Sequence, residues 1–168
     1  MIRVFDICSG IGGFSLALHA TGGYKTVGFC EFDEYCQTIL KKNFPDVPIF
    51  KDLKELAKDE DTIRSIPDHD LICGGVPCQS WSAAGKQKGT EDDRHLWPSM
   101  FDIIIKKKPT YVVVENVRGF ITLGGADLVL HDLESARYAS TTLVLPALSV
   151  KAPHRRDRVW IIGKKIQE

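Results

Sequence analysis

A cysteine held between a proline and a glycine-rich loop is the strongest candidate for chemistry in this sequence. Cys78 lies in the segment 74–89, GGVPCQSWSAAGKQKG, directly after the apolar run HDLICGG. A buried strand over that run would place the thiol just past the carboxyl end of a central strand, where open α/β sheets bind ligands. Pro77 fixes the backbone before the thiol, and the glycines allow tight turns. A thiolate presented in this way is a nucleophile, although most free cysteines are simply buried.

Charged side chains stand at the ends of two later apolar runs. Glu115 closes the run TYVVV, and it would lie beside the Cys78 loop if the two strands are neighbours, as consecutive strands usually are. Arg156 and Arg158 belong to HRRDR, directly before VWIIG. They could form a solvated turn, but a guanidinium group at the start of a buried strand is well suited to recognise a carbonyl or a phosphate.

The first 31 residues combine a glycine turn with an acid at a strand end. Residues 3–6 predict a strand, CSGIGGF a turn and residues 15–20 a helix. Gly10, Gly12 and Gly13 would let the backbone approach a ligand at the amino end of that helix. The spacing is not GxGxxG, and a plain tight turn would also explain it. A second apolar run ends at Glu31, where a carboxylate can accept both hydroxyls of a ribose.

The remaining pattern alternates strands and helices. An amphipathic helix is predicted over residues 33–43, with Tyr35, Ile39 and Leu40 as core contacts. Asp52 follows a short strand and is either a helix N-cap, which the residues alone favour, or a contact to a purine amino group. Further helices are predicted at 96–107 and 128–137, and strands at 138–145 and 159–163. In the first of these helices Trp97, Met100, Ile103 and Ile104 should face the core.

Composition indicates one globular domain. The chain has 168 residues and balances 22 Lys and Arg against 22 Asp and Glu, so no global basic charge points to nucleic acid. No apolar run approaches the ~20 residues of a membrane span and no signal peptide is visible, so we expect a cytoplasmic protein. The five cysteines show no CxxC spacing, which argues against a disulfide framework and a metal site.

Five segments in order resemble the cytosine-5 DNA methyltransferases: DICSGIGGFSLAL, CEFDEY, GGVPCQSWSAAGKQKG, VVVENVRGF and APHRRDRVWIIG. The resemblance implies an α/β fold with a doubly wound, mostly parallel seven-stranded sheet of the S-adenosylmethionine-dependent methyltransferase type, which is Rossmann-like. Six strands should be parallel and one, near the end, antiparallel. Residues 1–168 would form the catalytic domain and lack a target-recognition domain.

The resemblance also assigns catalytic roles. Cys78 matches the thiolate that adds to carbon 6 of cytosine, and Glu115 matches the carboxyl group at ring nitrogen 3, which needs a raised pKa to donate a proton. Arg156 would reach the cytosine O2 and Arg158 would support the same pocket. The target base must be flipped out of the duplex. The matching substrate-binding positions are Gln79, Ser80, Ser82, Asn116 and Val117.

The implied cofactor is S-adenosyl-L-methionine, with S-adenosyl-L-homocysteine as product. Glu31 would hold the ribose and Phe32 one face of the adenine, and Asp52 becomes a contact to the adenine amino group, which reverses the preference for a cap. Many family members have Phe where Cys8 stands, so cofactor affinity should be lower, whereas His154 in place of a commoner Gln should matter little. The other matching positions are Asp6, Ser9, Gly10, Gly12 and Gly13 at the methionine end, and Leu53, Pro77 and Leu96 in the cleft.

DNA is the implied partner, in a bacterial or phage-encoded restriction-modification setting, associated with the nucleoid. A second polypeptide would supply the recognition region and the final motifs, and it should dock on an exposed apolar patch of this chain. The neutral net charge agrees with a missing basic recognition region. Two alternatives remain: a truncated or inactive lobe that acts as a cofactor-binding or interaction module, and an RNA cytosine-5 methyltransferase.

Overall fold

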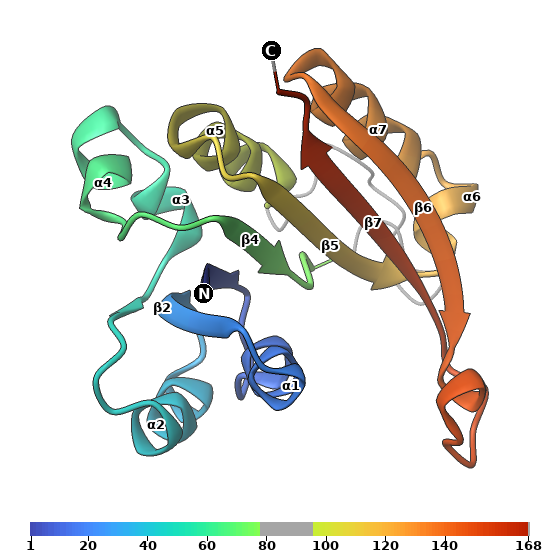
Figure 1. Ribbon diagram of the computed structural model, residues 1–168, viewed down its shortest axis with the longest axis horizontal. Coiled ribbons are helices and arrows are strands. Elements are labelled where there is room, and N and C mark those ends of the chain that lie inside the picture. The colour runs from blue at the N-terminus through green and yellow to red at the C-terminus, as the bar shows by residue number, and fades with distance from the viewer. Residues whose placement is uncertain (78–95, 168) are drawn as a thin grey trace.

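The protein is an α/β domain built on one sheet, seen in a computed structural model that describes residues 1–77 and 96–167 (Figure 1). The predicted site residues Cys78, Gln79, Ser80 and Ser82 lie outside the described residues. In chain order the elements are β1 (Ile2–Ile7), α1 (Gly13–Thr21), β2 (Tyr24–Cys30), α2 (Glu34–Asn43), β3 (Ile49–Phe50), α3 (Leu53–Leu56), α4 (Glu60–Ser65), β4 (Leu71–Gly74), α5 (Trp97–Lys107), β5 (Tyr111–Val117), α6 (Gly119–Thr122), α7 (Gly125–Ser135), β6 (Tyr138–Pro146), the 3-10 helix η2 (Ala147–Val150) and β7 (Asp157–Lys165).

The seven strands are ordered β3-β2-β1-β4-β5-β7-β6. Every pair from β3 to β5 is parallel, whereas β7 runs antiparallel to both β5 and β6. The predicted sheet of six parallel strands and one antiparallel strand is therefore confirmed. The strand order reverses between β1 and β4, and ligands of open α/β sheets bind at the carboxyl edge beside such a reversal.

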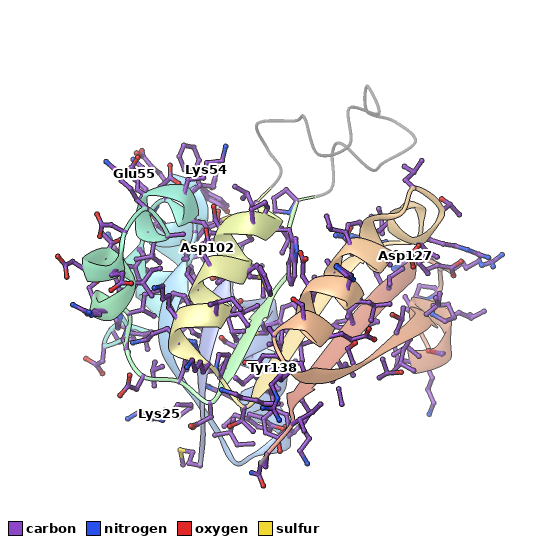
Figure 2. All side chains as sticks on the ribbon, turned by 90° about the horizontal axis from the view of Figure 1, so that it is seen from above. Lys25, Lys54, Glu55, Asp102, Asp127 and Tyr138 are labelled. Carbon is purple, nitrogen blue, oxygen red and sulfur yellow. The ribbon has the colours of Figure 1, made fainter. Side chains whose placement is uncertain are left out.

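Helices cover the two faces of the sheet unequally. Figures 1 and 2 show α5 and α7 side by side over one face, and the core cluster on that face also includes residues of α3 and α4. On the other face, α1 packs on β1 and β4, and α2 packs on β2. Among the described residues the α1 side of β5, β7 and β6 is covered only in part, through Phe14 and Leu18 of α1, which pack near Val113 and Trp160. Burial alternates along β5 for this reason.

Two predictions about helix packing had different outcomes. Trp97, Met100, Ile103 and Ile104 are all buried in the core under α5, as predicted. The prediction that Tyr35 is a core residue was wrong, because its side chain is 73% exposed. The helix α2 instead packs through Leu40, together with Phe44 beyond its end, against Phe29 of β2. The apolar pattern does not decide on which side of the helix a tyrosine in the first turn lies, so it could not show whether Tyr35 faces the core.

Candidate active site

A cavity of about 530 Å³ opens at the carboxyl edge of β1, β2 and β4. Seven of the residues that line it were predicted as cofactor contacts from sequence: Cys8, Glu31, Phe32, Asp52, Leu53, Pro77 and Leu96. Sequence reasoning missed the other four, which are Cys30, Lys51, Lys54 and Gly75. Each of the four is adjacent in sequence to a predicted residue or lies two positions from one. Reasoning from strand ends therefore selected residues that line one cavity, and it overlooked the neighbours of those residues.

The carboxylate of Glu31 is fixed by backbone N–H groups. Its Oε2 accepts a hydrogen bond of 2.6 Å from the backbone N–H of Gly10, and its Oε1 accepts one of 2.9 Å from that of Asp33. Gly10 belongs to the glycine turn and has φ of +53°, a left-handed conformation that glycine adopts without strain. Each carboxylate oxygen has a second acceptor position, so both can still bind a hydroxyl.

Asp52 caps α3 and also lines the cavity. Its Oδ1 accepts hydrogen bonds from the backbone N–H groups of Lys54, at 2.8 Å, and Glu55, at 3.4 Å. The cap that the residues alone favoured is present, and it uses only one of the two carboxylate oxygens in these bonds. The cap and a contact to a ligand are therefore compatible, because the cap holds the carboxylate in place at the cavity.

Asp6 and Ser9 lie beneath the glycine turn rather than in the cavity wall. Asp6 is fully buried, and its Oδ2 accepts a 2.8 Å hydrogen bond from the hydroxyl of Ser15 in α1. Its Oδ1 has no partner among the described residues. Burial raises the pKa of Asp6 to about 7, and the Ser15 hydrogen bond opposes this shift. The Ser9 hydroxyl donates to the Asp6 carbonyl oxygen at 2.6 Å, which closes the turn.

None of the three predicted glycines lines the cavity of about 530 Å³. A Cβ on Gly12 would lie 3.0 Å from the Leu40 side chain, and φ is +91°, so this position favours glycine for packing and for backbone conformation. Gly13 begins α1 and lines an apolar groove of about 480 Å³ on the partly covered face of the sheet. That groove is walled by Phe14 and Leu18 of α1 and by Trp160 of β7.

A second polar cluster lies at the carboxyl end of β5 and the amino end of β7. The Nε of Arg158 is 2.8 Å from the Oε1 of Glu115, and both side chains are about three-quarters buried, with 23% and 24% exposed. Burial raises the pKa of Glu115, and the positive charges of Arg158 and Arg156 oppose that shift. The structure thus brings Arg158 into direct contact with Glu115. Arg156 is exposed, with φ of +36°, and acts on Glu115 through its charge.

Asn116 ties the end of β5 to the segment that leads into Cys78. Its side-chain nitrogen donates a 3.2 Å hydrogen bond to the carbonyl oxygen of Val76, and its Oδ1 accepts one of 2.8 Å from the backbone N–H of Val117. Gly75 adds a second contact, because a Cβ there would lie 3.1 Å from the Oε2 of Glu115. Residues 75–77 therefore contact both the cavity of about 530 Å³, through Gly75 and Pro77, and the Glu115 cluster, through Gly75 and Val76.

The four described cysteines are unsuited to nucleophilic catalysis at neutral pH. Burial raises the thiol pKa of Cys8 to about 12 and also raises that of Cys30 and Cys73. The pKa of Cys36 is raised as well, first by desolvation and then by hydrogen bonding to Asp33. Because the thiolate is the nucleophile, these four thiols are poor candidates.

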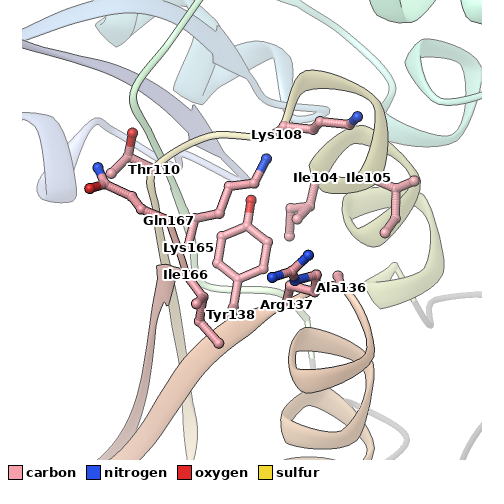
Figure 3. A pocket seen from close by; sticks show the side chains of 10 residues that line it. All are labelled: Ile104, Ile105, Lys108, Thr110, Ala136, Arg137, Tyr138, Lys165, Ile166 and Gln167. Atoms are coloured by element: carbon pink, nitrogen blue, oxygen red, sulfur yellow. The ribbon is translucent and has the colours of Figure 1, made fainter.

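A larger cavity, of about 620 Å³, lies at the opposite edge of the sheet (Figure 3). It is lined by Ile104 and Lys108 near the end of α5, by Arg137 and Tyr138 at the start of β6, and by Lys165 at the end of β7. Figure 3 shows these side chains around the cavity. None of the predicted site residues lines it. The larger cavity thus lies away from the carboxyl edge, where open α/β sheets bind ligands.

The described residues contain no group of three or more His, Cys, Asp and Glu side chains arranged to hold a metal ion. Within the same residues, no helix has the length and apolar character needed to cross a membrane. The described cysteines are free. His154, which stands in place of a commoner glutamine, is exposed.

Comparison with known proteins gives relatives over nearly the whole chain. The chain is 35% identical over 165 residues to the Type II methyltransferase M.HhaI of Haemophilus parahaemolyticus, covering 96% of this chain and 48% of that protein. It is 36% identical over 169 residues to the orphan methyltransferase M.Rho11sI of Bacillus phage rho11s, covering 96% and 33%. The chain thus spans about half, or less, of the length of these relatives.

Solved structures agree in fold. A putative DNA modification methyltransferase encoded within an Escherichia coli prophage superimposes with a TM-score of 0.78 at 26% identity, covering 98% of this chain and 47% of that one. The methyltransferase EhMeth of Entamoeba histolytica gives 0.83 at 19% identity, covering 99% and 54%, which supports the fold alone. Residues 2–168 match the family described as C-5 cytosine-specific DNA methylase, and this chain belongs to that family.

Proposed function

We propose that this chain transfers a methyl group from S-adenosyl-L-methionine to carbon 5 of cytosine in DNA, through a covalent adduct between Cys78 and a flipped base. It acts as the catalytic part of a split or minimal enzyme, with residues 1–168 as one catalytic domain. Its place is the cytoplasm of a bacterium or a phage-infected cell, in association with the nucleoid.

The observation that carries this proposal is the convergence of two sites on the segment before Cys78. Gly75 and Pro77 line the cofactor cavity, and Gly75 also adjoins the Glu115 carboxylate. Asn116 holds the Val76 carbonyl oxygen from the neighbouring strand. The described residues that lead to Cys78 therefore adjoin both the cavity proposed for the methyl donor and the Glu115 carboxyl group, and the reaction requires these groups close together.

The cavity fits the proposed cofactor in the chemistry of its lining. Glu31 presents a carboxylate, held by two backbone N–H groups, to the ribose hydroxyls. Phe32 is 68% exposed at the cavity and offers an aromatic face to the adenine, and Asp52 offers an acceptor to the adenine amino group. When bound, S-adenosyl-L-methionine supplies an electrophilic methyl group.

The residues around the base prepare carbon 5 to attack. Addition of the Cys78 thiolate to carbon 6 makes carbon 5 enamine-like, and negative charge builds at ring nitrogen 3. Glu115 donates a proton or a hydrogen bond there, and burial favours its protonated form. Arg158 orients the Glu115 carboxyl group through their 2.8 Å contact, and Arg156 supplies positive charge near the cytosine O2. After transfer, the carbon-5 proton leaves and the thiol is eliminated.

We place the docking of the second polypeptide on the partly covered face of the sheet. The groove beside α1 is lined mainly by apolar side chains, among them Phe14, Val113 and Trp160. Exposed apolar residues of β6 and η2 extend this apolar surface toward the carboxyl edge: Leu143, Leu145, Leu148 and Val150. Such a surface is uncommon on a monomer and supports a partner that completes the enzyme.

The proposal is tested by separating binding from transfer with Cys78→Ser. Cofactor affinity is measured by calorimetry, and transfer is measured as labelled methyl groups in an oligonucleotide, with the chain alone and with the protein encoded by a neighbouring reading frame. We expect transfer to be abolished and cofactor affinity to stay nearly unchanged. Cys36→Ser is the control and should keep both. Transfer by Cys78→Ser would contradict the mechanism, and loss of both properties would make Cys78 structural.

A further inference from the structure

Two arginines share one carboxylate in a small cavity at the carboxyl edge, on the other face of the sheet from the Glu115 cluster. The Nη1 of Arg118 donates to the Oδ2 of Asp157 at 3.1 Å, and the Nε of Arg155 donates to its Oδ1 at 3.1 Å. The three residues line a cavity of about 340 Å³ together with Ile121, Thr122, Val144 and Pro146. The catalytic roles proposed above use none of these side chains.

The exposure of the three side chains differs sharply. Asp157 is 15% exposed, whereas Arg118 is 62% and Arg155 is 74% exposed. The carboxylate therefore lies below and the guanidinium groups extend outward. Each contact uses one N–H of a guanidinium group that carries five, so donors remain for a ligand. Ion pairs with such exposed arginines contribute little to stability. Stability alone therefore does not explain why Arg118 and Arg155 are both paired with Asp157.

We propose that Arg118 and Arg155, held apart by Asp157, form a clamp for a backbone phosphate of the nucleic-acid strand that carries the target base. Guanidinium groups bind phosphate oxygens through paired hydrogen bonds, and a carboxylate that fixes them lowers the cost of ordering them. The apolar Ile121 and Val144 in the same cavity wall suit the sugar beside that phosphate.

The position of the clamp agrees with such a strand. Arg118 follows Glu115 by three residues at the end of β5, a distance of about 10 Å along an extended chain. Arg158, which contacts Glu115, is the residue after Asp157, and its Nη1 donates to the Asp157 carbonyl oxygen at 3.0 Å. Successive residues of β7 face opposite sides of the sheet, so Asp157 faces α6 and Arg158 faces the α1 side with Glu115. The clamp and the Glu115 site therefore lie on opposite faces of the sheet at the same carboxyl edge, and a strand that carries the target base would cross that edge. This inference rests on the proposed function, because that function places a nucleic acid at Glu115.

Nucleic acid is favoured over an acidic protein by the local charge. Residues 154–158, HRRDR, and Arg118 bring four arginines to the carboxyl edge, against the carboxylates of Glu115 and Asp157, in a chain whose net charge is zero. A cationic strip next to a site for one base matches a polymer with a phosphate at every nucleotide. An acidic peptide would need no neighbouring base site.

The test measures oligonucleotide binding by the full chain with S-adenosyl-L-homocysteine, by fluorescence anisotropy from about 50 to about 200 mM salt. Loss of the contact to one phosphate lowers the salt slope by about 0.7 to 0.9, so the affinity of Arg118→Gln/Arg155→Gln should fall about threefold less over this range than that of the unaltered chain. Arg118→Lys/Arg155→Lys should keep the slope, because it keeps the charges, and bind more weakly because the fork geometry is lost.

Arg64→Gln on α4 is the matched control, since Arg64 is also exposed and paired with carboxylates, Glu60 and Asp61. Its slope should equal that of the unaltered chain. An unchanged slope in the Arg118 and Arg155 variants, or no salt-dependent binding by the unaltered chain, would overturn the clamp. Displacement of a poly-glutamate probe without any effect on the oligonucleotide would overturn it in favour of a protein partner. If the salt slope changes as predicted but the unaltered chain transfers no methyl group, the result would contradict only the proposed function.

Discussion

The two halves of the carboxyl edge hold their acids in different ways. In the cofactor half, formed by β3, β2, β1 and β4, Glu31 and Asp52 accept hydrogen bonds from backbone N–H groups. In the arginine half, formed by β5, β7 and β6, Glu115 and Asp157 are paired with guanidinium groups. Backbone partners leave the carboxylate charge in place, whereas arginines offset or reverse it.

This difference would allow a chain of zero net charge to hold the two charged ligands that we propose for it. A carboxylate held by neutral N–H groups suits the hydroxyls and positive charge of the proposed cofactor. A cluster with more arginines than acids suits a phosphate polymer. The formal net charge sums over both halves and therefore does not show that acidic and basic groups are separated between them. Net charge is thus a weak argument about binding partners when ligands of opposite charge bind at one edge of a sheet.

The largest effect that distinguishes the two halves is expected when the carboxyl group of Glu115 is removed from the arginine half. Glu115→Gln keeps the shape but cannot donate a carboxylic proton, so methyl transfer should fall by about 10²- to 10⁴-fold. Cofactor affinity, measured by calorimetry, should not change, because Glu115 is outside the cofactor cavity. A parallel loss of cofactor affinity would show that the two halves are not separate.

The matching change in the cofactor half is Glu31→Ala. It removes a charged acceptor and should weaken S-adenosyl-L-methionine binding by ~1.5–3 kcal/mol. Glu34→Ala is the control, because Glu34 is an exposed acid on α2 that pairs with Lys51. Calorimetry of both variants gives the comparison, with denaturant unfolding to check that loss of the Gly10 hydrogen bond has not unfolded the turn. Unchanged affinity in Glu31→Ala would remove Glu31 from the site.

A smaller effect is expected at Asp6, the buried acid of the cofactor half. Its folded pKa is raised to about 7, so the stability it contributes is complete below the unfolded pKa and is lost as pH rises through about 7. Between about pH 6 and 8 the free energy of unfolding should fall by about 1 kcal/mol more in the unaltered chain than in Asp6→Asn. Urea unfolding at the two pH values measures this difference. Parallel pH dependence in the two proteins would mean that Asp6 titrates normally.

The sequence predicted the positions of strand ends well and the partners of side chains poorly. Glu31, Asp52 and Glu115 were recognised because each closes an apolar run, and all three lie at the carboxyl edge. The Arg158–Glu115 pair was not predicted, because antiparallel register decides which residue of β7 faces β5. Asp157 was missed for a similar reason: its two arginines come from different strand ends, and an acid inside a basic segment has no local signal.

Glycines show the same limit in the first half of the chain. Gly10, Gly12 and Gly13 were taken together as one ligand-binding turn. The structure gives them three environments: a hydrogen bond to Glu31, contact with Leu40, and the apolar groove beside α1. Spacing alone cannot separate a glycine needed for a ligand from one needed for packing, because both require a missing Cβ.

Trapping with a 5-fluorocytosine oligonucleotide tests the central claim most directly. The fluorine cannot leave carbon 5, so an enzyme that attacks carbon 6 stays bound to the base after methyl transfer. The chain is incubated with cofactor and oligonucleotide, alone and with the neighbouring-frame protein, and the adduct is mapped by mass spectrometry. We predict an adduct on the peptide that contains Cys78. Methyl transfer without that adduct, or an adduct on another cysteine, would contradict the account.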